Sequence, residues 1–399
     1  MVGETARRAV KVALLSCAAA ACGLGLLLGC EAERAASPAA QVPQVQQPAP
    51  PAGYRVPRGA VRVSTGRELR AARAARRRSA IVLAAGSYRS HRPFLNARGH
   101  HLYAAHRGRA VLRAGLSLGG NSGRGGALVR GVVIDVDDPD RTVEGAAVAV
   151  WGVGRDARIL DTTLRGNGVM SAGIAARRPD GLRIRRVVVR RFTDFGILVD
   201  ANDADRGILA DPFRIEDADV ARIARSDAGS SNGRAEACVW IGNTGVVRRV
   251  RARSCAWSGL WTGTATTRAL VEDVDVDRAR TGVYLEHFTR DSTFRRLRAG
   301  PGVRIGLVAE WAAPEWGNLP ASVGNLVELS HFESSLAGVY LDDGTTRTAV
   351  RRSAFANQSW AAIGDYRGSG NSFEANDFSG IDAGAGTVRT DHLSSAREG

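Results

Sequence analysis

The sequence predicts an all-β solenoid, a fold in which short strands stack coil upon coil. First, a unit of about 22 to 26 residues recurs from residue 127 onward in the 399-residue chain. Second, each unit holds a short strand of β-branched or large apolar residues, a Gly- or polar-rich corner, and a strand that reads Gly-apolar-x-apolar. Third, helical periodicity is confined to one short stretch before residue 80. Stacked coils explain this combination better than separate hairpins do.

The repeat is clearest in "ALVEDVDVDRARTGVYLEHFTRD" and "LVELSHFESSLAGVYLDDGTTR", which both return to Gly-Val-Tyr-Leu followed by an acid. Leucine-rich repeats have a comparable period, but their spacing of Leu and Asn is absent here. The units at 208–245 and 292–325 are longer than the others. Extra length in a solenoid becomes loops on one face, and such loops often shape a binding site.

The repeat, together with its opening "AIVLAAGSYR", resembles the pectin-lyase-like superfamily over residues 58–385. That resemblance implies a single-stranded right-handed parallel β-helix with a short N-terminal capping helix. Thr65 and Glu68 form a capping-box pattern that predicts this helix over 68–77, and a strand at 80–84 should follow. An uncovered first coil would present unpaired backbone groups to other chains, so a cap is expected there.

The N-terminus predicts export. Arg7, Arg8 and Lys11 precede an apolar run, which indicates a signal peptide over 1–29. Its end, Leu-Leu-Gly-Cys at 27–30, resembles the bacterial lipoprotein box and implies lipidation of Cys30. An uncleaved membrane anchor is the alternative. A Pro/Ala/Gln-rich tether at 30–57 and a C-terminal tail at 386–399 would flank the β-helix. We expect the protein to be a monomer. It would be lipid-anchored to the bacterial membrane and would face the cell surface or periplasm.

The formal net charge of +15 raises the question of a nucleic-acid partner. However, Lys11 is the only lysine and all other basic residues are arginine, which is typical of codon bias as much as of phosphate binding. An exported protein rarely meets nucleic acid, so we expect no nucleic-acid partner. Cys238 and Cys255 are the cysteines left beyond residue 30. They could form a disulfide or stay as two buried thiols.

Aligning the units places the first strand's charges in a column whose sign alternates from coil to coil. The column contains Arg185-Arg186, Glu216-Asp217, Arg248-Arg249, Glu272-Asp273, Arg295-Arg296, Glu328, Arg351-Arg352 and Glu374. Neighbouring coils lie about 4.8 Å apart, so each acid would sit between arginines. This pattern predicts a structural ladder of ion pairs.

The second strand of each unit predicts an outward stripe of aromatic and acidic residues. The alternation of strands sends Val283 and Leu285 inward and their neighbours outward. The expected sugar-binding aromatics are Trp240, Trp261, Tyr284, Tyr340 and Trp311, because flat rings suit the apolar faces of sugars. Loops that cover these rings are the alternative. Beside them, Glu286, Glu310 and Asp342 repeat like charges on consecutive coils, which favours a raised pKa or a bound cation.

The catalytic residues expected from this stripe are Glu286, Glu310, Asp342, Asp343 and His287. Two carboxylates on neighbouring or alternate coils have the spacing of glycosidase pairs. Alternatively, Asp200, Glu286, Glu310 and Asp342 could hold Ca²⁺, as the resemblance to polysaccharide lyases of this fold implies, with His287 or Arg304 as the base. Among family signatures, only Asp342-Asp343 matches the Asp-Asp of polygalacturonase-like hydrolases, so no catalytic set transfers.

The sequence therefore predicts a surface-anchored protein that binds and cleaves an extended polysaccharide, containing uronic acid or neutral sugars, by lyase or hydrolase chemistry. The alternative is a non-catalytic carbohydrate-binding, adhesive or structural β-helix, because β-helices serve both uses.

Overall fold

The computed structural model describes residues 56–74, 79–96, 98–119, 126–150, 156–168, 170–177, 180–200, 212–223, 236–263, 266–310 and 320–393. All of them belong to one compact unit that begins at Val45. The expected signal peptide, Cys30 and almost all of the tether lie outside the described residues. Within the described ranges, no helix is both long and apolar enough to cross a bilayer.

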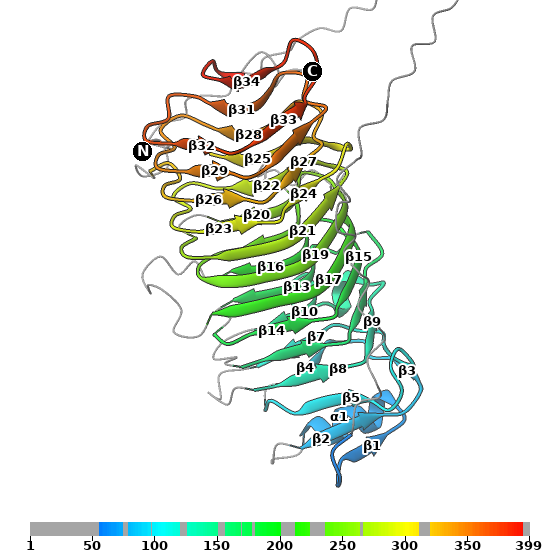
Figure 1. Cartoon of the computed structure of the whole chain (residues 1–399). Helices are drawn as coiled ribbons and strands as arrows, with labels where there is room; N and C mark the ends of the chain where they lie inside the picture. The colour runs from blue at the N-terminus through cyan, green and yellow to red at the C-terminus, as the bar shows by residue number, and fades with distance from the viewer. Residues whose placement is uncertain are drawn as a thin grey trace, which may run out of the picture. The chain divides into compact units, whose positions relative to one another are not determined.

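The described strands form the right-handed parallel β-helix that the sequence predicts, and Figure 1 shows its coils following one another in chain order. One coil consists of β14 (Arg183–Arg185), β15 (Val188–Phe192) and β16 (Phe195–Asp200). The first two strand types make up a 22-stranded sheet, here called sheet A, and the third makes up a 12-stranded sheet, here called sheet B. Most coils thus have three strands and not two, because the segment expected to form one strand bends into a second.

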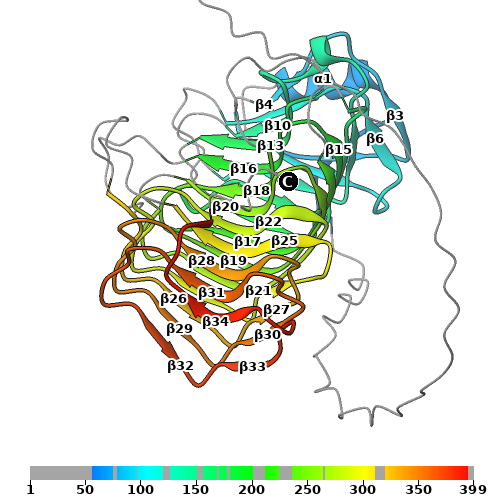
Figure 2. The same ribbon diagram turned by 90° about the horizontal axis from the view of Figure 1, so that it is seen from above.

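The strands of sheet B follow one another along one side of the solenoid, as Figure 2 shows for β10, β13, β16 and β18. They are β4 (Phe94–Asn96), β7 (Leu116–Leu118), β10 (Ala146–Val150), β13 (Ala172–Arg177), β16, β18 (Ala237–Ile241), β20 (Ser258–Thr262), β22 (Ala279–Leu285), β25 (Val303–Ala309), β28 (Ala337–Leu341), β31 (Ala361–Asp365) and β34 (Gly386–Arg389). The last of these lies beyond residue 385, so the solenoid takes in the start of the segment expected to be a tail.

The strands of sheet A are shorter, except where both strand types of a coil merge in β17, β19 and β21. They are β1 (Val61–Val63), β2 (Ala80–Leu83), β3 (Gly86–Tyr88), β5 (His101–Ala104), β6 (Ala110–Leu112), β8 (Leu128–Arg130), β9 (Val133–Asp135), β11 (Arg158–Leu160), β12 (Thr163–Arg165), β14, β15, β17 (Phe213–Ile223), β19 (Gly245–Cys255), β21 (Leu270–Asp277), β23 (Thr293–Arg295), β24 (Arg298–Ala299), β26 (Leu326–Glu328), β27 (His331–Phe332), β29 (Ala349–Arg351), β30 (Ala354–Ala356), β32 (Ser372–Glu374) and β33 (Asp377–Gly380). A 3-10 turn, η1 (Pro139–Arg141), is the other short element.

Helix α1 (Gly66–Ala74) precedes the second strand of the solenoid, as the capping pattern predicts. The hydroxyl of Thr65 accepts a hydrogen bond from the backbone N–H of Glu68 at 3.2 Å. The Glu68 carboxylate reaches one residue further back than expected and accepts from the backbone N–H of Ser64 at 2.7 Å. Leu69 on this helix is fully buried in the core, which fixes the helix against the first coils.

A column of inward side chains fills the solenoid behind sheet B, and its register explains the repeated glycine. Val283 pairs with Leu307, and Leu307 pairs with Val339, and all three are buried. A Cβ on Gly306 would lie 2.3 Å from the Phe332 ring, and one on Gly338 would lie 2.2 Å from the Phe355 ring. At these two positions the glycine is therefore required for space, because a phenyl ring of the core occupies the place of its side chain.

The ladder of alternating charges is present on sheet A. Arg185 contacts Asp217 at 3.1 Å, and Arg248 contacts Glu272 at 2.8 Å, each across neighbouring coils. The second residue of each pair lies at the bend between two strands and has a left-handed backbone, as in Arg186 with φ of 52°. Side chains at this bend spread over the corner, so each acid can meet arginines from both neighbouring coils.

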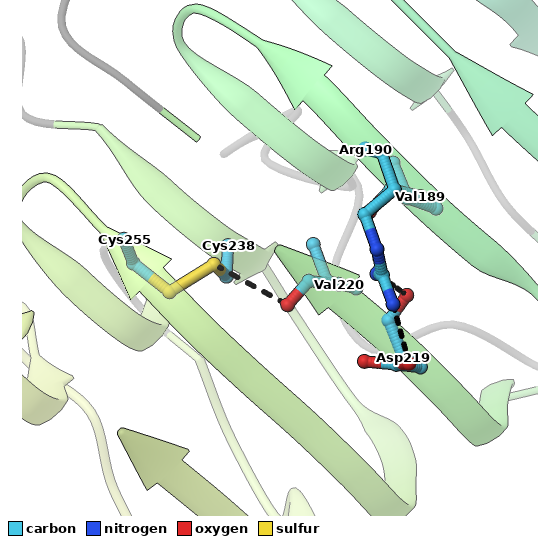
Figure 3. Close-up of a disulfide and its surroundings, with 6 residues drawn as sticks. All are labelled: Val189, Arg190, Asp219, Val220, Cys238 and Cys255. Atoms are coloured by element: carbon cyan, nitrogen blue, oxygen red, sulfur yellow. Dashed lines mark hydrogen bonds and ion pairs between the residues drawn. A yellow bond between two sulfur atoms is a disulfide. The ribbon is translucent and has the colours of Figure 1, made fainter. Parts of the chain in front are cut away.

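Cys238 of β18 and Cys255 of β19 form a disulfide with an S–S distance of 2.04 Å, which settles the alternative that the sequence leaves open (Figure 3). Both residues are buried, and Cys238 Sγ lies 3.9 Å from the carbonyl oxygen of Val220. The bond links sheet B to sheet A inside one coil, where it replaces an apolar contact of the core.

Removing this disulfide should destabilise the fold. The bond closes a loop with a sequence separation of 17, and a loop of this size corresponds to about 3 kcal/mol of lost unfolded-chain entropy. The Cys238→Ala/Cys255→Ala protein should therefore unfold at a lower denaturant concentration than wild type. Reductant added during unfolding should lower the wild-type midpoint and leave that of the double variant unchanged. A wild-type midpoint that ignores reductant would contradict the bond.

Candidate functional site

The outward aromatic column lies on sheet B in the predicted register. Trp240 pairs with Trp261, Trp261 with Tyr284, Tyr284 with Val308, and Val308 with Tyr340. Trp240, Trp261 and Tyr284 are each half-buried, and the rings of Trp261 and Tyr284 meet edge to face at 5.1 Å between centroids. Three consecutive coils thus present partly exposed rings on the outer face of the sheet.

Tyr340 is not part of this exposed stripe, contrary to the sequence expectation. Its side chain points outward from β28 but is only 1% exposed. The backbone N–H of Leu393 donates to the Tyr340 hydroxyl at 3.4 Å, and the Leu393 side chain is buried against the same ring. The chain after β34 returns over sheet B and covers this position. Coverage of the column, the alternative that the sequence left open, therefore applies at Tyr340.

The acid column begins where the strands of sheet B end. The backbone N–H of Glu310 donates to the carbonyl of Leu285 at 2.9 Å, and that of Asp342 donates to the carbonyl of Ala309 at 2.9 Å. These bonds continue the parallel ladder beyond the strands, so Glu286, Glu310 and Asp342 lie on successive coils. The structure brings together the three acids that the repeat predicts.

Each acid of the column receives a hydrogen bond from an aromatic residue beside it. The Trp261 indole N–H donates to Glu286 Oε2 at 3.1 Å, and the Tyr340 hydroxyl donates to Asp342 Oδ1 at 3.1 Å. The Tyr284 hydroxyl donates to the carboxyl of Glu310. The two columns therefore form one polar network, in which the aromatic polar atoms fix the carboxyl groups.

Glu310 is the central acid of this network, and its pKa lies above the usual range of a glutamate. Burial is the main cause, and the neighbouring charges of Glu286 and Asp342 add to it. The hydrogen bond from Tyr284 and the nearby His287 act in the opposite direction but do not outweigh burial. His287 Nε2 lies 3.3 Å from Glu310 Oε2 and is buried with its ring. A carboxyl group that keeps its proton to higher pH suits proton donation.

A cavity of about 280 Å³ opens over sheet B next to Glu310. Its wall contains the ring of Tyr284, the carboxyl-bearing Glu310 and the apolar Val308. Three further lining residues, which were not expected as a group from the sequence, are Trp257, Arg280 and Arg304. Each stands two positions before the repeated glycine, in Trp-Ser-Gly, Arg-Thr-Gly and Arg-Ile-Gly. This second column was therefore visible in the repeat, and the Arg280 guanidinium lies 4.3 Å from the centroid of the Trp257 ring.

The remaining predicted site residues lie apart from this cavity. Asp343 is half-buried at the surface, where it meets Arg367 at 3.3 Å. Asp200 precedes Glu286 by three coils, because the coils of Gly242 and Gly263 separate them in the backbone ladder. Asp342 is almost fully buried, with His392 Nε2 at 3.8 Å. Trp311 lies outside the described residues.

The residues of the acid column do not fit the expected calcium site. Among the described residues, no three of His, Cys, Asp and Glu are arranged so that they could hold a metal ion. Calcium takes six to eight oxygen ligands, whereas Glu310 faces Tyr284 and His287, and Asp342 faces Tyr340. The described acids of this column therefore do not supply the set of oxygen ligands that calcium needs.

No protein-family model matches this sequence, and none of the curated proteins matches it. Among solved structures, the catalytic domain of a GH87 α-1,3-glucanase in complex with tetrasaccharides is similar over 86% of this chain and 70% of that chain, with 12% identity and a TM-score of 0.51. The A-module of the mannuronan C-5 epimerase AlgE4 from Azotobacter vinelandii matches over 78% and 91%, with 15% identity and a TM-score of 0.44. PfbA, a surface adhesin of Streptococcus pneumoniae, matches over 79% and 88%, with 10% identity and a TM-score of 0.48. At these identities the likeness shows the fold alone.

Proposed function

We propose that this protein binds an extended polysaccharide along the outer face of sheet B and cleaves it by hydrolysis, with Glu310 as the proton donor. The observation that carries the proposal is the position of Glu310, whose carboxyl has a raised pKa and lines a cavity beside the aromatic column. General acids in glycoside hydrolysis need this combination of a retained proton and access to the glycosidic oxygen.

The other residues have three roles in this proposal. The rings of Trp240, Trp261 and Tyr284 provide a path for successive sugars on consecutive coils. Glu286 is the second carboxylate, held by the Trp261 indole, and acts as nucleophile or as base for water. His287 was expected to be catalytic, but its ring is too buried to meet a substrate. We assign it to positioning Glu310.

The cavity's two arginines favour an acidic sugar over a neutral one. Arg280 and Arg304 line the same wall as Glu310, and guanidinium groups bind carboxylates well. The GH87 glucanase domain holds tetrasaccharides on the same fold. A fold by itself does not decide between activities, so the substrate class rests on the lining residues of this cavity.

A non-catalytic binding protein is the second candidate, and one observation favours it. Residues near 393 cover Tyr340, and Asp342 is closed off with it, so of the three acids only Glu310 lines the cavity. A rigid adhesive surface would use the same aromatic column without turnover.

The location outside the cytosol is also part of the proposal. A disulfide between Cys238 and Cys255 is the form expected in an oxidising compartment. The apolar run before Cys30 supports export followed by lipid anchoring. Labelling of wild type, but not of Cys30→Ser, with a fatty-acid analogue in a bacterial host would support the anchor.

An assay on a panel of neutral and uronic polysaccharides separates the candidates. We expect new reducing ends without unsaturated uronate products, at a rate that a chelator leaves unchanged. Unsaturated products would identify a lyase and overturn the hydrolytic assignment. Tight binding of a polysaccharide with no product of either kind would show that the protein is a non-catalytic binding protein.

A further inference from the structure

A second cavity, of about 570 Å³, lies on a different part of the solenoid, at the corner where β12, β15, β17, β19 and β21 end. Within the described part of the chain, it shares no lining residue with the cavity beside Glu310. Six arginines line it, and we call it the arginine groove: Arg165, Arg190, Arg191, Arg222, Arg253 and Arg278. Asp135 is the one acid among the described residues that line it.

The register shows that the arginines of the groove do not alternate with acids. The row at the strand ends reads Asp135, Arg165, Arg190, Ala221, Arg253 and Asp277. At the corner beside it, Arg191 and Arg222 occupy the same place on neighbouring coils. Like charges directly opposite each other are destabilising. The first corner of the same coils avoids this cost by its alternating ladder, so the neighbouring arginines of the groove call for another explanation.

The acids nearby neutralise only part of this charge. Asp219 contacts both Arg190, as Figure 3 shows, and Arg253, and Asp277 lies 3.4 Å from Arg278. Within the described ranges, Arg165, Arg191 and Arg222 make no ion pair, and all three are exposed. The Nε of Arg253 is buried and has no hydrogen-bond partner among the described residues. The groove therefore keeps excess positive charge and an unsatisfied donor.

We propose that the arginine groove binds an acidic polysaccharide that carries a carboxylate or sulfate on successive sugars. Guanidinium groups are planar forks that match such anions in two-point contacts. Neighbouring coils repeat the arginines about every 4.8 Å, which is comparable with the length of a sugar unit in an extended chain. The groove thus presents cations in a row along the direction in which a polysaccharide would run.

The lining residues favour a polysaccharide over nucleic acid. Proteins that hold single strands combine a positive groove with aromatic side chains on which bases stack. Those lining residues of the groove that the structure describes contain no aromatic side chain. The proposal does not depend on the hydrolytic function, because binding in the groove can be measured whether or not sheet B cleaves a substrate.

The test compares two double variants of the full chain. In Arg191→Asn/Arg222→Asn, two groove cations are lost from positions whose φ values are 63° and 58°. Asparagine tolerates this left-handed backbone better than most residues. The control, Arg268→Asn/Arg347→Asn, loses two exposed arginines that have φ of 52° and no ion pair among the described residues, at a different corner. Thermal unfolding of both variants checks that the fold is kept.

Binding is measured by calorimetry with polygalacturonate, dextran sulfate and uncharged dextran at low and high salt. We expect the groove variant to bind the acidic polymers about tenfold more weakly than wild type, which corresponds to about 1.4 kcal/mol, with a shallower salt dependence. The control should bind like wild type. The two acidic polymers distinguish carboxylate from sulfate as the preferred group.

Three outcomes would overturn the proposal. In the first, the groove variant binds the acidic polymers as tightly as wild type does. In the second, uncharged dextran binds as tightly as dextran sulfate. In the third, a single-stranded oligonucleotide displaces both acidic polymers from the protein. If it does so at a lower concentration of anionic groups than either polymer needs for binding, the groove would be assigned to nucleic acid.

Discussion

Replacing Glu310 with glutamine is expected to lower kcat on the cleaved polysaccharide by a factor of about 10² to 10⁴ and to change KM little. The amide keeps the shape of the side chain and can still meet Tyr284 and His287, but it cannot donate a proton to the glycosidic oxygen. Reducing-end kinetics of purified wild type and variant measure both constants. Glu374→Gln, an exposed carboxylate on sheet A, is the matched control and should leave both constants unchanged.

The same substitution should make the fold more stable at neutral pH. The pKa of Glu310 is raised in the folded protein, chiefly by burial, so the folded state holds this proton more tightly than the unfolded chain does. Its contribution to stability is therefore complete below the unfolded pKa and is lost as the pH rises through the folded pKa. Glutamine cannot ionise and escapes this loss. Denaturant midpoints of wild type should fall relative to the variant as the pH rises across that interval.

Together the two results distinguish a catalytic acid from a structural one. If Glu310 were purely structural, the glutamine variant would be less stable than wild type. Any loss of activity would then be no larger than the loss of folded protein explains. A variant that is as active as wild type would remove Glu310 from the mechanism, whatever its stability.

The fold was predictable because its repeat lies in local patterns that every coil obeys. Inward residues such as Val283 and Val339 occupy every second position of their strands, as the sequence pattern indicates. Aligning the repeated glycine of each unit then gave the pairing register between neighbouring coils. The extra strand in most coils was not predictable in the same way. It depends on a left-handed bend at residues such as Arg186 and Asp217, and neither arginine nor aspartate marks such a bend as glycine would.

For the candidate site, the sequence could predict only which residues stack in columns along one face of the solenoid. Trp261, Tyr284, Glu286 and Glu310 fall into place because stacking alone sets their neighbours. The burial of Tyr340 was not predictable, since it depends on Leu393 returning over the sheet from beyond the last strand. A repeat describes contacts between neighbouring coils, whereas this contact joins residues far apart in the sequence.

Asp161 lies one coil before Arg186 and extends the charge ladder in that direction. The ladder is expected to contribute most there, because the Asp161 carboxylate has no solvent exposure. Its two oxygens accept hydrogen bonds from Arg130 Nε at 2.9 Å and from Arg186 Nε at 2.6 Å. Burial by itself raises the pKa of Asp161, but the hydrogen bonds and charges of these arginines outweigh it, and the pKa is lowered. The ionised carboxylate therefore matters to the fold, although its environment is dry.

Asp161→Asn should destabilise the protein by about 3 kcal/mol, because removing one partner of a buried ion pair leaves the other charges uncompensated. Asparagine keeps the size of the side chain and suits the left-handed φ of 53° at this bend, so lost charge is the main change. Asp291→Asn, at an exposed position with φ of 50°, is the control and should shift stability by less than about 0.5 kcal/mol.

The stability difference between wild type and Asp161→Asn should depend on pH. Because the folded pKa of Asp161 is lowered, its stabilising contribution is present above the unfolded pKa and is lost as the pH falls through the folded pKa. Denaturant midpoints of wild type and Asp161→Asn should therefore differ most near neutral pH and converge in strong acid. A difference that stays constant with pH would mean that the cost comes from packing of the amide, and the ladder would then hold the coils by shape and not by charge.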